Sequence, residues 1–119
     1  MKIRDLTKDE VTFKVSIEPE DIPVRGNACA IDPETDKATE DTILAELDRG
    51  NVAAWCIIVV RASWNEFSSA AYLGECSYAT EKEAIKDVES YDLKDQALAT
   101  LNEDIQATFE KLSALIIPI

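Results

Sequence analysis

Alternation of apolar and polar residues defines the first element of the chain. Residues 11–17 place an apolar side chain at every second position. A period of two is typical of a strand with one buried face, so this pattern predicts a half-buried strand. Its inward-facing residues are expected to be Val11, Phe13, Val15 and Ile17. The strand is expected to end at Pro19, because proline cannot donate to a sheet ladder. A second short strand is expected over 28–31, after a turn at 25–27.

A helix is predicted next. Residues 32–38 are polar and loop-like, and Thr39 is placed to cap a helix over 40–49. Acidic residues in the first turn would interact favourably with the positive end of the helix dipole. The apolar stripe of this helix consists of Ile43, Leu44 and Leu47. Gly50 follows directly and is expected to end the helix.

Two strands are predicted after this helix. Residues 52–62 form a short, strongly apolar run that is rich in β-branched side chains, which favours a central strand covered on both faces. A turn is expected at 65–66, and residues 67–78 return as the partner strand. Gly74 falls inside this second strand, where it indicates a bulge or a close approach of another group to the backbone.

Two capping signals predict two further helices. Thr80 and Glu83 match a capping box that starts a short helix. Ser90 or Asp92 is expected to cap the last and longest helix, over 93–115. Its apolar residues recur three and four apart, and this stripe suits packing on a sheet. They are Leu93, Ala97, Leu98, Leu101, Ile105, Phe109, Leu112 and Leu115. The apolar tail 115–119 is expected to fold back onto the core or, failing that, to form a dimer contact.

These elements predict an α+β fold in a single domain over 1–119. An antiparallel sheet of three to four strands is expected to pack against the long C-terminal helix, accompanied by two shorter helices. The length of 119 residues fits one domain, and an apolar content of 46% is enough for an ordinary core.

The net charge of the chain limits the classes of partner that it can bind. Twelve Lys and Arg against 24 Asp and Glu give a net charge of −12. Direct binding to nucleic acid is not expected, because it draws affinity from cationic side chains that release counterions. An anionic membrane surface would repel the chain as well. We therefore expect neutral or basic partners. Three cysteines without CxxC spacing, with no signal peptide, favour a reducing cytoplasm, that of a bacterial host cell given the resemblance described below.

Standard catalytic chemistry is missing from the sequence. It contains no histidine, which removes histidine-based triads and the usual zinc and iron ligand sets. Three glycines leave no phosphate-binding loop. We expect no enzyme activity and no cofactor, although an unfamiliar hydrolase that uses carboxylates stays a third hypothesis. Asp32, Glu34 and Asp36 are spaced like the start of a calcium loop, but Lys37 replaces the required glycine, which favours a solvated loop.

The acidic excess concentrates between residues 32 and 48. This segment holds seven acids (Asp32, Glu34, Asp36, Glu40, Asp41, Glu46 and Asp48) and one base, Lys37. A rigid row of carboxylates can imitate phosphates and occupy a basic groove, while the plain alternative is a face that provides solubility. The candidate partner-binding residues are Asp36, Glu40, Asp41, Glu46 and Asp48, together with Trp64. Trp64 lies next to a turn and is either a core residue or a protein–protein anchor.

Several short motifs resemble a group of small acidic proteins from phages, prophages and plasmids. The likeness spans about 24–104 and rests on Val24-Arg25-Gly26-Asn27-Ala28, Gly50-Asn51, Ala54-Trp55-Cys56, Tyr72-Leu73-Gly74, Cys76-Ser77-Tyr78 and Ala97-Leu98…Leu101-Asn102. This resemblance implies a mobile-element setting, in which small acidic proteins often inhibit host defence, as anti-CRISPR and anti-restriction proteins do.

Two functional hypotheses follow from the charge and the resemblance. The first is a non-enzymatic inhibitor that binds a basic host protein, or a nucleic-acid-binding defence complex, through an acidic surface that mimics nucleic acid. The alternative is a structural or regulatory homodimer without mimicry, joined through the Trp64 region or the apolar tail.

Overall fold

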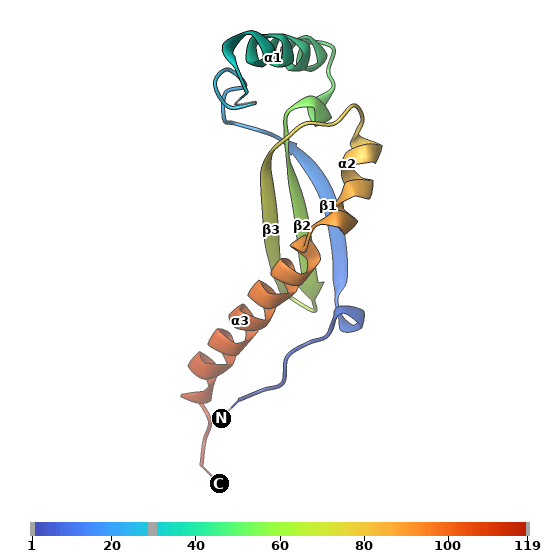
Figure 1. Cartoon of the computed structure of the whole chain (residues 1–119). Helices are drawn as coiled ribbons and strands as arrows, with labels where there is room; N and C mark the ends of the chain where they lie inside the picture. The colour runs from blue at the N-terminus through green and yellow to red at the C-terminus, as the bar shows by residue number, and fades with distance from the viewer. Residues whose placement is uncertain (1, 29–30, 119) are drawn as a thin grey trace. The chain divides into compact units, whose positions relative to one another are not determined.

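The computed structural model describes residues 2–28 and 31–118 and shows a mixed α+β fold (Figure 1). Within these residues, three strands form an antiparallel sheet in the order β1-β2-β3, and three α-helices accompany it. The strands are β1 (Thr12–Pro19), β2 (Cys56–Trp64) and β3 (Phe67–Cys76), and the helices are α1 (Pro33–Asp48), α2 (Glu81–Asp87) and α3 (Leu93–Ser113). Short 3-10 turns are η1 (Lys8–Glu10), η2 (Val52–Ala54) and η3 (Val88–Ser90). The predicted fold class and the long C-terminal helix are confirmed.

The central strand is β2, as its unbroken apolar sequence predicted. Ile58, Val59 and Val60 are consecutive and all fully buried, so both faces of β2 are covered. The strand begins later than expected, at Cys56, because residues 52–54 form η2 instead. The N–H of Ala54 donates to the carbonyl of Asn51 at 3.1 Å and closes this turn.

The described residues group into two compact units, and every strand contributes to both. The α3 unit comprises the described residues of Met1–Lys14, Val60–Ala71 and Asp92–Ile119. The α1 unit comprises those of Val15–Val59 and Tyr72–Tyr91.

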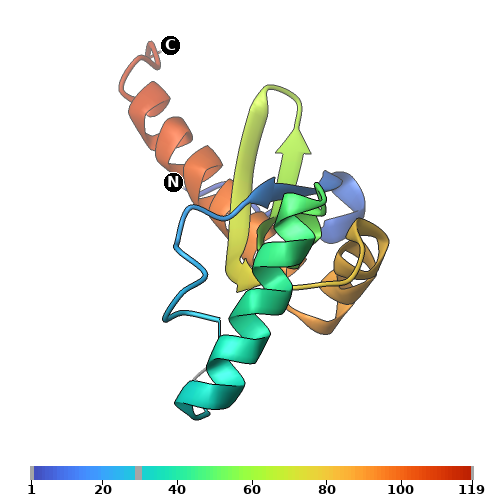
Figure 2. The ribbon, with the colours of Figure 1, turned by 90° about the horizontal axis from the view of Figure 1, so that it is seen from above.

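The core of the α1 unit forms where α1 meets η2. Buried Val24, Ile43, Ala54 and Trp55 pack together, and Ala28, Leu44 and Leu47 lie against them. The Trp55 indole Nε1–H donates to the carbonyl of Ile22 at 2.6 Å, which satisfies its polar atom and holds the 20–28 loop. Figure 2 shows this loop running beside α1.

Helix α1 begins at Pro33, so the predicted loop over 32–38 and the Thr39 cap are wrong. Asp32 caps the helix, since its Oδ1 accepts a hydrogen bond from the N–H of Thr35 at 2.8 Å. This bond also lowers the pKa of Asp32. Proline fits the first helical position, where its missing N–H has no intrahelical partner to lose.

The segment before α1 is a turn, as predicted at 25–27. Gly26 has φ of +85°, a conformation that favours glycine. The short strand predicted over 28–31 falls partly on residues 29–30, outside the described residues. Its described ends, Ala28 and Ile31, lie in bends.

Gly74 marks the close approach that the sequence indicated. A Cβ atom at this position would lie 2.7 Å from Oε1 of Glu20. The same oxygen accepts a hydrogen bond from the N–H of Glu75 at 2.7 Å, and Glu75 has φ of +54°. The Glu20 carboxylate therefore supports an irregular stretch of β3. A side chain at position 74 would displace this carboxylate.

The N-cap positions of the last two helices follow the sequence, but only one of the predicted cap bonds forms. Oγ1 of Thr80 accepts a hydrogen bond from the N–H of Glu83 at 3.2 Å at the start of α2. Of the two candidates for α3, Asp92 occupies the N-cap position, although its side chain makes no bond to the helix backbone.

Burial along α3 stops near its middle. Leu93, Ala97 and Leu101 are buried, and no described residue of α3 beyond Leu101 is. Four apolar side chains after this point are 56–79% exposed, namely Leu112, Leu115, Ile116 and Ile117. The prediction that the tail folds back onto the core is therefore wrong for its described residues, because the second half of α3 has no core left to cover; Ile119 lies outside them.

Candidate functional site

The exposed face of α1 carries a row of three carboxylates. Glu34, Asp41 and Asp48 follow one another at intervals of seven residues, and all three are exposed. Seven residues make nearly two helical turns, so neighbours in the row are about 10 Å apart on one face. Asp41 and Asp48 are among the partner-binding residues predicted from the sequence, and Glu34 is not.

Glu40 lies about 100° around α1 from Asp41, on the buried side of the helix. It is 8% exposed, and both of its carboxylate oxygens are bonded within the α1 unit. Oε1 accepts from the Arg25 guanidinium at 3.1 Å, and Oε2 accepts from the N–H of Gly26 at 2.7 Å. The sequence offered no signal for this, because Arg25 lies 15 positions away. Glu40 holds the 20–28 loop against α1 rather than facing solvent.

Asp41 shares this arginine. The second guanidinium nitrogen of Arg25 donates to Oδ1 of Asp41 at 2.5 Å. The hydrogen bond to Asp41, followed by that to Glu40, raises the pKa of Arg25. The pair of Arg25 and Asp41 is half-exposed on both sides, so water screens it. Asp41 stays accessible, but part of its charge is balanced.

The remaining two predicted acids are half-buried. Asp36 accepts a hydrogen bond from the N–H of Ile31 at 3.1 Å, close to the start of α1. Glu46 lies 3.6 Å from the Arg49 guanidinium, one helical turn further on. Each lies five residues from Asp41, about 140° around the helix, so neither belongs to the exposed row.

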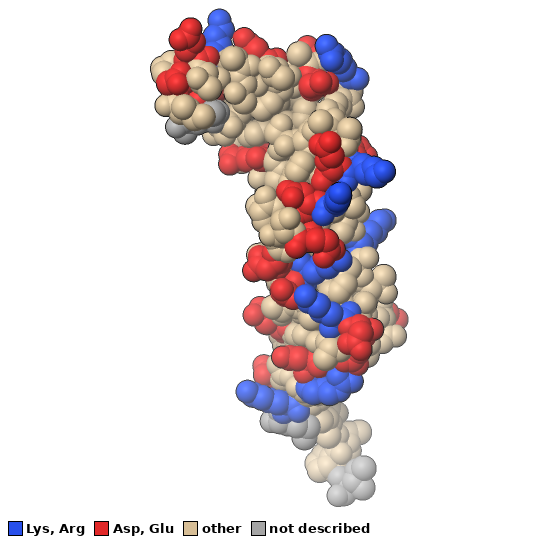
Figure 3. All heavy atoms as spheres, turned by 45° about the vertical axis from the view of Figure 1, so that its right-hand side comes forward, with Lys and Arg blue, Asp and Glu red and all other residues tan. Residues whose placement is uncertain are grey.

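The charges on the face drawn in Figure 3 are mixed. Lys and Arg groups lie among the Asp and Glu groups there. No continuous acidic field covers this face, although the chain has a net charge of −12. Binding through acidic groups would depend on particular carboxylates such as the α1 row.

Trp64 belongs to the α3 unit. It is 37% exposed and stacks on Phe67 across the β2–β3 turn, with ring centroids 6.3 Å apart. Its ring lines a hollow of about 350 Å³ with apolar neighbours from the N-terminal segment and α3. The lining residues are Ile3, Arg4, Asp5, Leu6, Trp64, Asn102 and Ile105. Trp64 is thus a partly exposed wall of an apolar groove.

The N-terminal segment is held along α3 by side-chain amides. The Asn102 amide pairs with both backbone groups of Leu6, accepting from its N–H at 2.8 Å and donating to its carbonyl at 3.1 Å. One turn later, Oε1 of Gln106 accepts from the N–H of Ile3 at 3.3 Å. Lys8 adds an ion pair to Asp95 at 2.6 Å. The segment therefore forms one wall of the groove.

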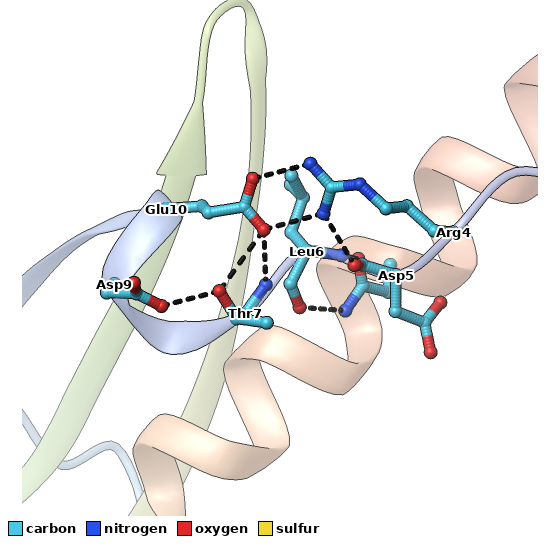
Figure 4. Close-up of polar contacts among 7 residues, drawn as sticks. Arg4, Asp5, Leu6, Thr7, Asp9 and Glu10 are labelled. Atoms are coloured by element: carbon cyan, nitrogen blue, oxygen red, sulfur yellow. Dashed lines mark hydrogen bonds and ion pairs between the residues drawn. The ribbon is translucent and has the colours of Figure 1, made fainter.

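A second cluster fixes the end of this segment (Figure 4). The Arg4 guanidinium donates to both carboxylate oxygens of Glu10, at 2.7 and 2.8 Å. The N–H of Thr7 donates to the same carboxylate at 3.0 Å. These bonds, that from Arg4 first, lower the pKa of Glu10 to about 2. Arg4 is therefore occupied by Glu10 and does not balance other acids nearby.

Three side chains of the α1 unit, Cys56, Cys76 and Tyr78, have raised pKa values. Burial raises the pKa of Cys56 to about 11 and raises that of Cys76 as well. Burial and the hydrogen bond from the Tyr78 hydroxyl to Asp87, at 2.5 Å, raise the pKa of Tyr78. Among the described residues, no cluster of His, Cys, Asp or Glu is arranged to hold a metal ion. No helix in the described ranges has the length and apolar character to cross a bilayer.

A scan against protein-family models finds no matching family. Searches of curated proteins and of solved structures likewise find no protein similar to this chain. The resemblance to small acidic proteins of mobile elements therefore stays a prediction, and it rests on the motifs between residues 24 and 104.

Proposed function

We propose that this chain is a non-enzymatic inhibitor that binds a basic, nucleic-acid-binding host complex through the exposed carboxylates of α1. The observation that carries the proposal is the row of Glu34, Asp41 and Asp48 on one exposed helix face. A helix fixes the spacing of these charges before binding, so little ordering is needed when a basic groove approaches. A mobile-element origin and an action in the cytoplasm of a bacterial host belong to the same proposal.

In this proposal the predicted site residues have different roles. Asp41 and Asp48 contact the partner together with Glu34, whereas Asp36 and Glu46 lie about 140° around α1 from Asp41 and contribute less. Glu40 acts as a positioning residue, because its carboxylate is bonded to Arg25 and Gly26. The row is short, about 20 Å from end to end, so it would fill only part of the groove in which the partner binds nucleic acid.

Affinity capture from a bacterial lysate, washed at low and then high salt, tests the proposal. We expect a nucleic-acid-handling complex to be retained at low salt and released at high salt, because salt screens exposed charges. The double variant Glu34→Lys/Asp48→Lys is expected to weaken binding of that complex at least tenfold. The matched control Glu18→Lys/Glu81→Lys makes the same charge change on exposed positions outside α1 and is expected to weaken it less than threefold. Equal losses for the two variants would reduce the α1 row to a contributor to solubility.

Self-association is the second candidate function, and the exposed tail favours it. Leu112, Leu115, Ile116 and Ile117 form an apolar surface at the end of α3. Contiguous apolar surface of this kind marks protein contacts in soluble proteins. A homodimer would be supported if the molar mass in analytical ultracentrifugation rises with protein concentration. The variant Leu115→Ser/Ile117→Ser should then have the mass of the monomer. A monomer at all concentrations would remove it.

A further inference from the structure

The α3 unit has a second hollow beside the apolar groove, and this one is acidic. It is shallow, with a volume of about 430 Å³, and its charged lining residues are Asp5, Glu103 and Glu110. Ala99 and Ala107 form part of its floor, so a neighbouring backbone could approach α3 closely. Asp5 and Asn102 line both hollows, which makes them one continuous surface. We call this the groove–shelf surface, with the apolar groove on one side and the acidic shelf on the other.

The carboxylates of the shelf have no cationic neighbour within the hollow. Among the described residues that line it, none is Lys or Arg. The salt bridges between described residues include Arg4 with Glu10 and Lys8 with Asp95, and none involves Asp5, Glu103 or Glu110. These three carboxylates are all exposed. The shelf therefore presents negative charge to a partner.

We propose that the groove–shelf surface binds a basic amphipathic helix of another protein. The groove, walled by Ile3, Leu6, Trp64 and Ile105, takes an apolar side chain of that helix. Lysine or arginine side chains on the adjacent flank of the helix then lie over the shelf. This arrangement is the helix-in-groove mode of recognition, in which apolar anchors give affinity and charges at the rim give selectivity.

The negative charge of the shelf favours one of three possible binding partners: nucleic acid, a second copy of this chain, or a basic segment of another protein. Nucleic acid is repelled by the three carboxylates. A second copy of this chain carries the same acidic surface and a net charge of −12, so it offers poor complementarity here. A basic segment meets both requirements of the surface, an apolar anchor and positive flanks. The surface lies on the α3 unit, so this inference stands independently of the proposed role of α1.

The test uses the full ¹⁵N-labelled chain and a synthetic amphipathic peptide. The peptide repeats leucine at helical spacing and carries lysine on one flank; a scrambled peptide and one with glutamate in place of lysine are the controls. We expect a saturable shift of the Trp64 indole N–H signal with the lysine peptide alone. The Trp55 indole N–H is an internal reference, because it is buried and bonded to Ile22 in the α1 unit.

Three variants locate the binding. Glu103→Lys/Glu110→Lys is expected to weaken peptide binding at least tenfold. The matched control Glu18→Lys/Glu81→Lys makes the same charge change on exposed residues outside both proposed surfaces and is expected to weaken it less than threefold. Trp64→Ser is expected to weaken peptide binding about tenfold while the other amide signals keep their positions, since truncating an aromatic anchor typically costs this much or more.

Equal losses for the two charge variants, or equal binding of the scrambled peptide, would overturn the proposal. A Trp64 signal that does not respond to peptide would do the same. So would one that shifts with the concentration of the chain alone, which would place a second copy in the groove. Failure here is distinguishable from failure of the α1 proposal, because the peptide is tested on Glu103 and Glu110 and the host complex on Glu34 and Asp48.

Discussion

Leu101→Ala is expected to lower the free energy of unfolding by about 3 kcal/mol, the middle of the range for removing a large aliphatic side chain from a core. Leu101 is fully buried and is the last buried residue of α3. Truncation leaves a cavity that its neighbours in the α3 unit fill only in part. The loss is therefore the sum of a transfer cost and a cavity cost.

Urea denaturation followed by circular dichroism measures this effect, with Leu112→Ala as the matched control. Both variants remove the same atoms from the same helix, but Leu112 is 56% exposed. We expect the control to change the free energy of unfolding by less than about 0.5 kcal/mol. A loss at position 112 comparable with that at 101 would mean that the exposed half of α3 is covered in solution, which would favour the homodimer.

The sheet could be predicted from the sequence because its signals are local. Alternation over 11–17 and the unbroken apolar run ending in β2 each identify a strand without knowledge of its neighbours. The turn at 65–66 then sets β2 and β3 side by side as an antiparallel hairpin. The caps at Thr80 and Asp92 are equally local, since each depends on residues within one helical turn.

Two errors in the fold have different causes: a local helix-start signal that outweighs the lack of an apolar stripe, and the lack of a surface for the tail to cover. The polar residues of 32–38 lack an apolar stripe, yet Asp32 and Pro33 start α1 there through their capping chemistry. The tail at 115–118 is apolar, yet burial depends on whether the rest of the unit offers it a surface. Composition of a segment alone could decide neither outcome.

The candidate site was predictable only in its total charge. The sequence placed seven acids between 32 and 48, but it could not say which of them the fold uses internally. Arg25 reaches Glu40 and Asp41 because the 20–28 loop lies along α1, and that contact depends on tertiary structure. The groove–shelf surface was missed for the same reason, since residues 3–6, 64 and 102–110 meet only in the folded chain.

Glu40→Ala is expected to lower the free energy of unfolding by about 2 kcal/mol, within the range for hydrogen bonds to charged groups. The substitution removes the acceptor of the Gly26 N–H and one of the two carboxylate partners of Arg25. Glu34→Ala is the matched control, because Glu34 is an exposed glutamate of the same helix. We expect the control to change stability by less than about 0.5 kcal/mol.

Binding measurements on the same two variants separate structural from partner-binding acids. Glu40→Ala, measured where the chain is folded, is expected to change the affinity for a basic partner less than threefold. Glu34→Ala is expected to weaken that affinity more than Glu40→Ala does, although it leaves stability almost unchanged. The reverse order would mean that Glu40 reaches the partner and that the Arg25 contact opens on binding. Glu40→Gln distinguishes these cases further, since its amide oxygen can still accept from Gly26 while the attraction to Arg25 is lost.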